Sequence, residues 1–203
     1  MNIISPYKNV EQYTRIIIEP HQMNTDIKNY MKYNLKKKVE KKCNKNGYVD
    51  EIYRITNYSD GFMIPENLSG NAIYDISYHC KLCIPIENSI IIGQVKVINQ
   101  ELIFAMNGPI MIFIPKDNID SNYWINNIDS FSHKENLNIK LNIGDYVCIQ
   151  IINKRINQYD TQIKTIGRLL DFATTDQTEE FFGSKITKLI ELELNEKTLD
   201  NYI

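Results

Sequence analysis

The stretch IIIGQVKVINQELIFAMNGPIMIFI at residues 90–114 decides the fold class of this chain. It contains three β-rich runs, which are separated by short turns rich in Asn, Gln, Gly and Pro. Two further β-rich runs follow at 146–152 and 162–170. Because five short strands with turn signals between them are the pattern of a small Greek-key barrel, we predict a five-stranded β-barrel over residues 85–172.

A polar insertion interrupts the predicted barrel at residues 117–140, and we expect it to form a surface loop, with or without a short helix. Barrels of this oligonucleotide-binding (OB) type bind single strands by stacking bases on exposed aromatic rings and by following the backbone with Lys and Arg. Alternatively, either Phe side chain fills the barrel core and the basic side chains form a solvated rim. The RNA-binding candidates are Lys96, Phe104, Phe113, Lys116, Lys154 and Arg155.

Upstream of the barrel, the sequence predicts a strand followed by a helix. The β-branched run at 15–18 stops before Pro20, because proline lacks the N–H that a continuing strand needs. Asn24 or Thr25 can cap the helix, and Asn46–Gly47 can close it. The apolar residues of the helix recur every four positions, at Ile27, Met31, Leu35 and Val39.

The remaining surface of this predicted helix is basic. A lysine face of this kind could meet phosphate, but a solvated face is the favoured interpretation, since long basic side chains keep an amphipathic helix soluble. The lysines are Lys28, Lys32, Lys36, Lys37, Lys38, Lys41 and Lys42.

The period of the apolar residues changes after Gly47 from about four to two, which predicts strands at 48–56, 61–64 and 72–84. A helix combined with antiparallel strands gives an α+β domain, which we place at residues 1–84. The whole chain is therefore predicted to be an α+β protein, with this domain first and the OB-type barrel second.

The C-terminal extension, residues 173–203, is predicted to be helical. A helix of about ten residues is marginal in isolation, so we expect it to pack against another surface. Its apolar residues at helical spacing are Ile186, Leu189, Ile190 and Leu194.

The composition is that of an ordinary soluble protein, with 203 residues, 43% hydrophobic, 24% charged and a net charge of −2. A charge this close to neutral argues against a bulk nucleic-acid coat. We expect no membrane span and no secretion signal, because the apolar runs are short or interrupted and residues 1–11 lack an apolar core with basic flanks. Four cysteines are too few for a disulfide scaffold, which favours reduced thiols in a cytosolic or nuclear setting.

Catalytic or metal-binding signatures are not apparent in the sequence. Cys80-x-x-Cys83 beside His79 could hold zinc, but zinc needs four ligands and the other two cysteines stand alone. In an alternating strand, residues three apart also point to opposite faces, which hinders chelation. There is no glycine-rich phosphate loop or nucleophile elbow. We therefore predict no catalytic residue, no metal and no cofactor, and a redox or hydrolytic role for Cys80 or Cys83 is kept as an alternative.

Several short motifs follow one another between residues 13 and 172. They are Gly47-Tyr48-Val49, Asp60-Gly61 with Pro65, Tyr74-x-Ile76-x-Tyr78, Phe104-Ala105, Gly108-Pro109, Phe113-Ile114, Gly144-Asp145 and Ile166-Gly167-Arg168-Leu169. In this order, the chain resembles the larger stalk subunit of multisubunit RNA polymerases. That family includes the seventh subunit of eukaryotic polymerase II and its archaeal counterpart.

The resemblance implies a non-catalytic subunit of a DNA-dependent RNA polymerase. In the family, the tip of the N-terminal domain inserts at the base of the polymerase clamp, and the barrel lies near the RNA exit path. The implied partners are the largest polymerase subunits, nascent single-stranded RNA and a small helical stalk partner, whose role the C-terminal extension could assume; no membrane is implied. On this chain, the tip would consist of residues 19–24 and 57–65. Its candidate docking residues are Pro20, His21, Asn24, Tyr58, Asp60, Gly61 and Phe62.

Residues 16–28 are also similar to the start of the smaller poxvirus polymerase subunit of this family. Together with an excess of Ile, Asn, Lys and Tyr that is typical of AT-rich genomes, this similarity suggests a large cytoplasmic DNA virus as the source. A viral subunit would act in viral factories in the host cytoplasm and be packaged in the virion, whereas a cellular one would act in the nucleus. The barrel alone also permits a free-standing single-stranded RNA-binding module, although such a module has no need of a paired-loop tip.

Overall fold

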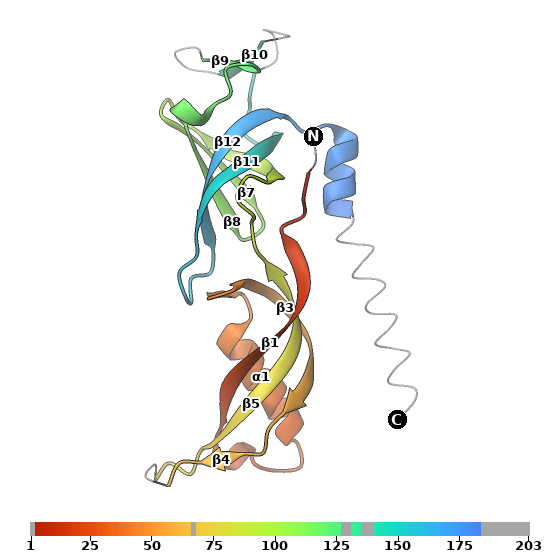
Figure 1. The fold of residues 1–203 in the computed structure, drawn as a ribbon, viewed down its shortest axis with the longest axis vertical. Helices are drawn as coiled ribbons and strands as arrows, with labels where there is room; N and C mark the ends of the chain where they lie inside the picture. The colour runs from red at the N-terminus through yellow and green to blue at the C-terminus, as the bar shows by residue number, and fades with distance from the viewer. Residues whose placement is uncertain (1–2, 66–67, 127–130, 135–139, 184–203) are drawn as a thin grey trace. The chain divides into compact units, whose positions relative to one another are not determined.

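The computed structural model describes residues 3–65, 68–126, 131–134 and 140–183, and Figure 1 shows its ribbon. Within these residues, the chain is mostly β-structure. It divides into two compact units. We call the unit formed by Pro6–Pro85 and Arg155–Ile163 the N-terminal unit, and the remainder of the described chain the barrel unit.

The N-terminal unit contains an antiparallel sheet in which one long strand is central. Strand β5 (Ala72–Cys83) pairs with β1 (Tyr7–Ile18) on one side and with β3 (Gly47–Tyr58) on the other. The order is β1-β5-β3-β2, with β2 (Lys42–Asn44) at the second edge. The short strand β4 (Phe62–Met63) pairs with the start of β5.

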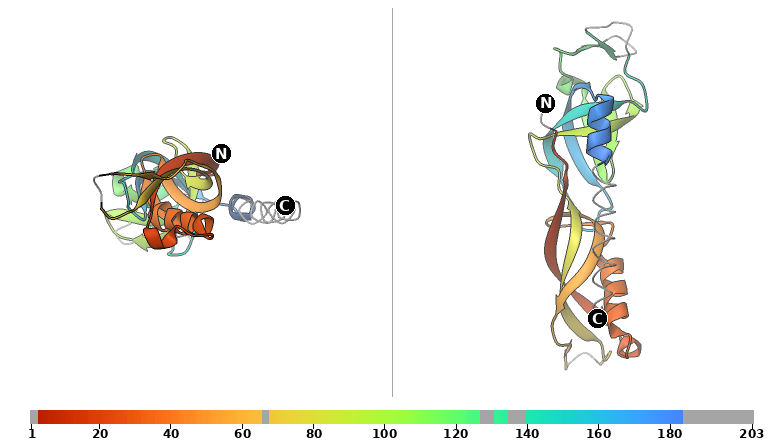
Figure 2. Two further views of the ribbon diagram at one scale, coloured as in Figure 1. Left: turned by 90° about the horizontal axis from the view of Figure 1, so that it is seen from below. Right: turned by 90° about the vertical axis from the view of Figure 1, so that its right-hand side faces the viewer.

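The two long pairings of β5 differ in regularity. β1 pairs with β5 in one unbroken register, from Tyr7 opposite Cys83 to Ile18 opposite Ala72. β3 pairs with β5 through three register shifts. Because shifts of this kind increase local twist, the strands coil strongly about one another, as Figure 2 shows.

Helix α1 (Ile27–Val39) lies beside this sheet (Figure 1). Its apolar stripe packs on the core residues of the sheet. Met31 and Leu35 are fully buried, and the outer members of the predicted stripe, Ile27 and Val39, are partly buried against the same core. The predicted stripe is therefore confirmed. The strand residues of this core are Ile16, Ile18, Val49, Ile52, Ile76, Tyr78, Cys80 and Leu82.

The predicted end of the helix at Asn46–Gly47 is wrong. α1 ends at Val39, because Glu40 is extended and Lys41 takes a left-handed φ of 58°. The chain then enters β2, which pairs with β3. Lys41 and Lys42 thus lie beyond the helix, since strand pairing outweighs the helical propensity of the lysine run.

The barrel unit contains a closed barrel of five strands in the order β11-β12-β8-β7-β6, which confirms the predicted barrel. The alternating apolar patterns and the turn residues between them located each strand to within a few residues. The strands are β6 (Ile90–Ile98), β7 (Leu102–Asn107), β8 (Ile110–Pro115), β11 (Tyr146–Arg155) and β12 (Ile163–Phe172).

Branched aliphatic side chains fill the barrel, and two glycines make room for them. Ile112 and Ile149 are fully buried. A Cβ at Gly167 would lie 2.5 Å from Ile149 Cγ2 and 2.9 Å from Ile112 Cγ2. A Cβ at Gly93 would lie 2.8 Å from Ile149 Cδ1. Packing, rather than backbone conformation, therefore requires glycine at both positions.

The polar insertion, expected to be a surface loop, contains a hairpin in its described part. The 3-10 turn η2 (Lys116–Asn118) leads into it, and strands β9 (Trp124–Asn126) and β10 (Phe131–His133) pair with each other. Trp124 is 3% exposed and donates its indole N–H to Leu170 O at 2.6 Å. This buried anchor on β12 explains why a polar segment adopts a defined conformation.

Residues 175–183 form a helix. Thr174 and Gln177 cap its start reciprocally, with Gln177 N donating to Thr174 Oγ1 at 3.3 Å and Thr174 N donating to Gln177 Oε1 at 3.1 Å. The apolar positions predicted at 186–194 lie outside the described residues. None of the helices in the described part of the chain has the length and apolarity needed to cross a bilayer.

We expect Gly167→Ala to lower the free energy of unfolding by about 1–3 kcal/mol, because the added methyl group would overlap Ile149 and Ile112 in the closed core. Gly183→Ala is the control, since a Cβ there has nothing within 4 Å and Ala is the better helix former. Urea unfolding followed by Trp124 fluorescence measures both variants. Wild-type stability of Gly167→Ala would contradict the packing described above.

Candidate functional site

Two loops meet at one end of the sheet in the N-terminal unit. The loop after β1 begins beside the start of β5, since Ile18 pairs with Ala72. The loop between β3 and β5 returns through β4, whose Met63 pairs with the same Ala72. A Cβ at Gly70 of this second loop would lie 3.3 Å from Pro20 Cγ of the first. The two loops are therefore in direct contact.

We call these two loops, residues 19–24, 57–65 and 68–71, the tip. Exposed apolar side chains are common singly on protein surfaces, whereas several on one loop are typical of an interaction site. The tip presents Tyr58 (46% exposed), Phe62 (61%), Met63 (52%), Ile64 (39%) and Leu68 (98%) to solvent. Its surface is thus suited to contact with another protein.

Backbone contacts hold this apolar loop on β5. Ser59 N donates to Asp75 O at 2.9 Å, and Asp75 N donates to Ser59 Oγ at 3.0 Å. Gly61 lies against the ring of Tyr74, so that a Cβ there would be 2.5 Å from the phenolic oxygen. Phe62 is therefore presented by a hydrogen-bonded frame rather than by an unsupported loop.

The other loop of the tip contains the 3-10 turn η1 (Pro20–Gln22). Gln22 is buried and accepts a hydrogen bond from Asn34 Nδ2 of α1 at 2.9 Å, which ties the turn to the helix. The seven residues predicted for the tip all lie in these two loops and are exposed: Pro20, His21, Asn24, Tyr58, Asp60, Gly61 and Phe62.

A second candidate surface lies on the outer face of β7 and β8 in the barrel unit. Phe104 and Phe113 are cross-strand partners, and their ring centroids are 5.3 Å apart. Both rings are half-buried, whereas the flanking pair Ile103 and Ile114 is fully buried. Because side chains alternate along a strand, both Phe rings lie outside the barrel.

The basic candidates fall into two groups. Lys96 lies at the β-bulge of β6, next to Val97, which pairs with Phe104. Lys116 directly follows β8. Both lysines are exposed. Lys154 and Arg155 lie at the end of β11, and Arg155 belongs to the N-terminal unit. The strand register therefore brings Lys96 and Lys116 near the Phe pair, and it does not bring Lys154 or Arg155 there.

The four cysteines are all buried. Within the described residues, no group of three or more His, Cys, Asp and Glu is placed to hold a metal ion. Burial raises the pKa of the Cys80 thiol to about 11. Burial, together with the charge of Asp160, raises the pKa of Cys43 to about 11. Both groups are thus protonated thiols at neutral pH, which is the unreactive form.

Comparison with known proteins identifies a relative, although no family model matches the chain. A protein of Acanthamoeba polyphaga mimivirus, named as a DNA-directed RNA polymerase subunit, is 36% identical to the chain over 182 residues. The match covers 90% of this chain and 91% of the mimivirus protein. The chain belongs to this family of viral RNA polymerase subunits. Because only about a tenth of the chain lies outside the match, the match extends into both units of this polymerase subunit.

Sequence reasoning missed part of the apolar surface of this polymerase subunit. Met63 and Ile64 lie within the predicted tip loop at 57–65 but were not predicted as docking residues, and Leu68 lies outside the predicted loop. A signal was present for the first two, because Phe62-Met63-Ile64 is an uninterrupted apolar run next to a proline in a segment too short to be a core strand. Leu68 stands alone between polar residues, and its sequence context carries no comparable signal.

We expect stability to fall as the pH rises from about 9 to about 11, because both thiols have an ordinary pKa of 9.0 and a native pKa of about 11. In this window the unfolded chain releases thiol protons that the folded chain keeps. Below pH 9 the protonated thiols contribute their full stabilisation. Between pH 8 and pH 10, the free energy of unfolding from urea titrations should therefore fall less for Cys43→Ala than for the wild type. An identical decrease in both proteins would contradict the raised pKa of Cys43.

Proposed function

We propose that this chain is a non-catalytic stalk subunit of a DNA-dependent RNA polymerase. In this proposal, the tip docks on the polymerase core near the clamp, against the largest subunits, and the barrel guides nascent RNA. Membership of a family of viral polymerase subunits supports the polymerase as the partner. The observation that carries the docking step is the group of exposed apolar side chains on the hydrogen-bonded frame of the tip.

The tip has the chemistry of an interface anchor. Burying a large apolar side chain contributes about 1.5–3 kcal/mol, and interfaces concentrate their binding energy in a few central aromatic residues. Tyr58 and Phe62 are the aromatic members of the exposed set. We therefore assign them as the anchors, with Met63, Ile64 and Leu68 as the apolar surround.

The frame of the tip favours binding for a second reason. Ordering a mobile loop on association costs conformational entropy, which reduces affinity. Here, Ser59 and Asp75 already fix the loop on β5, and Gln22 fixes the neighbouring turn on α1. The apolar side chains are thus presented in place before the partner arrives.

The barrel supplies the chemistry for RNA contact. The Phe104 and Phe113 rings on the outer face can stack on bases, and the ammonium groups of Lys96 and Lys116 can hold phosphates. Since the net charge of the chain is −2, these local lysines, rather than the overall field, must attract the strand. Such contacts follow the backbone and the stacked bases and confer little sequence preference.

The double change Tyr58→Ala plus Phe62→Ala should reduce association with the polymerase about tenfold or more, because it removes both aromatic anchors. The measurement is co-purification of the largest polymerase subunits with the tagged variant from cells that make the polymerase. Circular dichroism should remain as in the wild type, since neither side chain belongs to the buried core.

A matched control is the double change Tyr33→Ala plus Ile143→Ala. These side chains are 62% and 68% exposed and lie outside the tip, on α1 and before β11. The control variant should retain wild-type recovery of the polymerase. Unchanged recovery with the tip variant would refute the docking proposal.

For the barrel, Phe104→Ala plus Phe113→Ala should weaken binding of a labelled oligouridylate by about tenfold, since base–aromatic stacking contributes about 1–3 kcal/mol per base. Met106→Ala plus Met111→Ala is the control, because these residues form the next cross-strand pair on the same face and carry no ring. Fluorescence polarisation gives both affinities. Equal affinities of the two variants would show that stacking on this pair has no part in RNA contact.

A further inference from the structure

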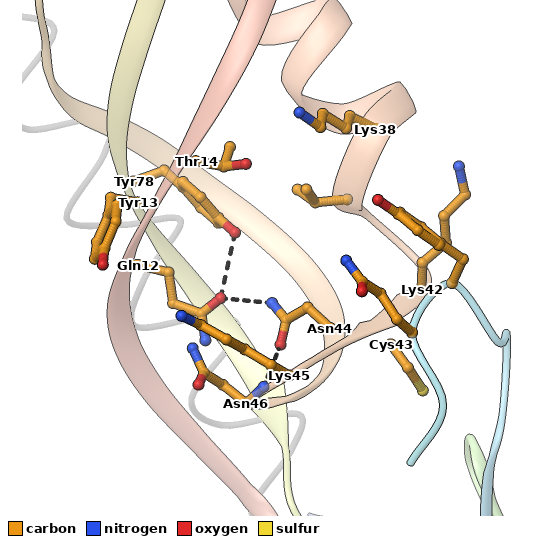
Figure 3. A pocket seen from close by; sticks show the side chains of 13 residues that line it. Gln12, Tyr13, Thr14, Lys38, Lys42, Cys43, Asn44, Lys45, Asn46 and Tyr78 are labelled. Atoms are coloured by element: carbon orange, nitrogen blue, oxygen red, sulfur yellow. Dashed lines mark hydrogen bonds between the residues drawn. The ribbon is translucent and has the colours of Figure 1, made fainter.

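The N-terminal unit contains a cavity that is separate from the tip. It has a volume of about 280 Å³, near the lower end of the range for small-molecule sites, which is about 300–1,000 Å³. Its walls come from the middle of β1, the end of α1, β2 with its turn into β3, and the loop at 158–159. Figure 3 shows the side chains that line it.

A chain of hydrogen bonds fixes the orientation of Gln12 in this cavity. Asn46 N and Gly47 N donate to Asn44 Oδ1 at 2.8 and 3.1 Å, so Asn44 must turn its Nδ2 outward. That Nδ2 donates to Gln12 Oε1 at 2.7 Å, and Tyr78 OH donates to the same oxygen at 3.3 Å (Figure 3). The backbone thus determines which end of the Gln12 amide is the acceptor.

This arrangement leaves the side-chain N–H₂ group of Gln12 available as a donor. Gln12 is only 8% exposed, and its Nε2 has no hydrogen-bond partner among the residues that the structure describes. Because this N–H₂ group faces the cavity, it can donate to a molecule that enters it. The cavity therefore presents a donor of fixed orientation to a ligand.

The charge of the cavity favours an anionic acceptor. Lys38, Lys42 and Lys45 line it, and none of its lining residues in the described chain is acidic. Lys38 and Lys42 each donate one N–H to a backbone carbonyl, of Arg15 and Lys37 respectively, which leaves further N–H groups on each ammonium. Lys45 is exposed, at the turn between β2 and β3.

One tyrosine ring flanks these donors. Tyr159 lines the cavity and is 63% exposed. Tyr13 also belongs to the lining, but its side chain points to the opposite face of β1 from Gln12, since side chains alternate along a strand (Figure 3). Tyr159 is held at the cavity, because Tyr159 N donates to Cys43 O at 2.8 Å and Cys43 N donates to Asp160 O at 2.7 Å. Its φ of 70° is uncommon for a bulky residue, so these bonds keep the loop in a strained conformation. An exposed ring in such a position offers a stacking surface.

We propose that this cavity binds a nucleoside phosphate, with the phosphate on the Lys45 ammonium and the Gln12 amide and the base against Tyr159. The combination of cationic donors, a fixed amide and a flanking ring matches the two ends of that ligand. The ligand is either a free nucleotide or one nucleotide of a strand, since both present the same chemistry. This binding does not depend on docking of the tip or on the barrel face.

Nuclear magnetic resonance on the full chain tests this proposal with uridine monophosphate, inorganic phosphate and pentauridylate as probes. The side-chain amide signals of Gln12 and Asn46 report binding in the cavity itself, whatever the barrel binds. We expect both signals to shift on addition of uridine monophosphate. Lys45→Glu should weaken that binding at least about tenfold, because it replaces a charge-assisted contact by repulsion.

Lys32→Glu is the matched control, since Lys32 is an exposed lysine of α1 that does not line the cavity. It should leave the affinity unchanged within about twofold. Tyr159→Asn keeps a residue that tolerates the left-handed φ of this position and should weaken binding of uridine monophosphate but not of inorganic phosphate. Tighter binding of pentauridylate than of the mononucleotide, with a steep salt dependence, identifies a strand as the ligand, and similar affinities identify a free nucleotide.

Two results would overturn the proposal. One is the absence of any shift of the Gln12 amide signal with all three probes. The other is an equal loss of affinity in Lys45→Glu and Lys32→Glu, which would reflect net charge and not the cavity. Loss of polymerase association in the tip variant has no bearing on either result.

Discussion

The pairing of β5 with strands on both sides is the constraint on which the N-terminal unit depends. Its register makes Ala72 the partner of both Ile18 and Met63, and so brings the two loops of the tip together. The same register sets Tyr78 opposite Gln12 and so forms one wall of the cavity. A slip of one residue would turn every side chain of the strand to the other face, and both features would be lost.

The predictable part of the fold is the part that local patterns encode. Alternation and turn residues located the barrel strands, and the four-residue repeat located α1. The end of α1 was not predictable, because the lysine run at 36–38 and 41–42 favours a helix, and only pairing of β2 with the distant β3 overrides that preference. The place of Arg155–Ile163 in the N-terminal unit likewise depends on contacts between Cys43 and a loop more than a hundred residues away.

The candidate surfaces differed in how far the sequence revealed them. The loop positions of Tyr58 and Phe62 marked an exposed aromatic pair, and the run that follows Phe62 extended it. The cavity could not be foreseen, because Gln12, Asn44 and Tyr159 come from three separate segments and meet only through tertiary hydrogen bonds. The tip and the cavity also differ in chemistry, since one is apolar and the other is cationic, which suits them to a protein and to a phosphate respectively.

Contact between the tip and the polymerase core is the step on which the proposed function depends. The most direct measurement replaces Phe62 with a photo-reactive phenylalanine analogue in the tagged full chain, irradiates cells that make the polymerase and identifies the cross-linked protein by mass spectrometry. We predict a cross-link to one of the two largest polymerase subunits, and none when the analogue replaces Tyr33 instead. Efficient cross-linking from position 62 to other proteins only, with the polymerase present, would contradict docking through the tip.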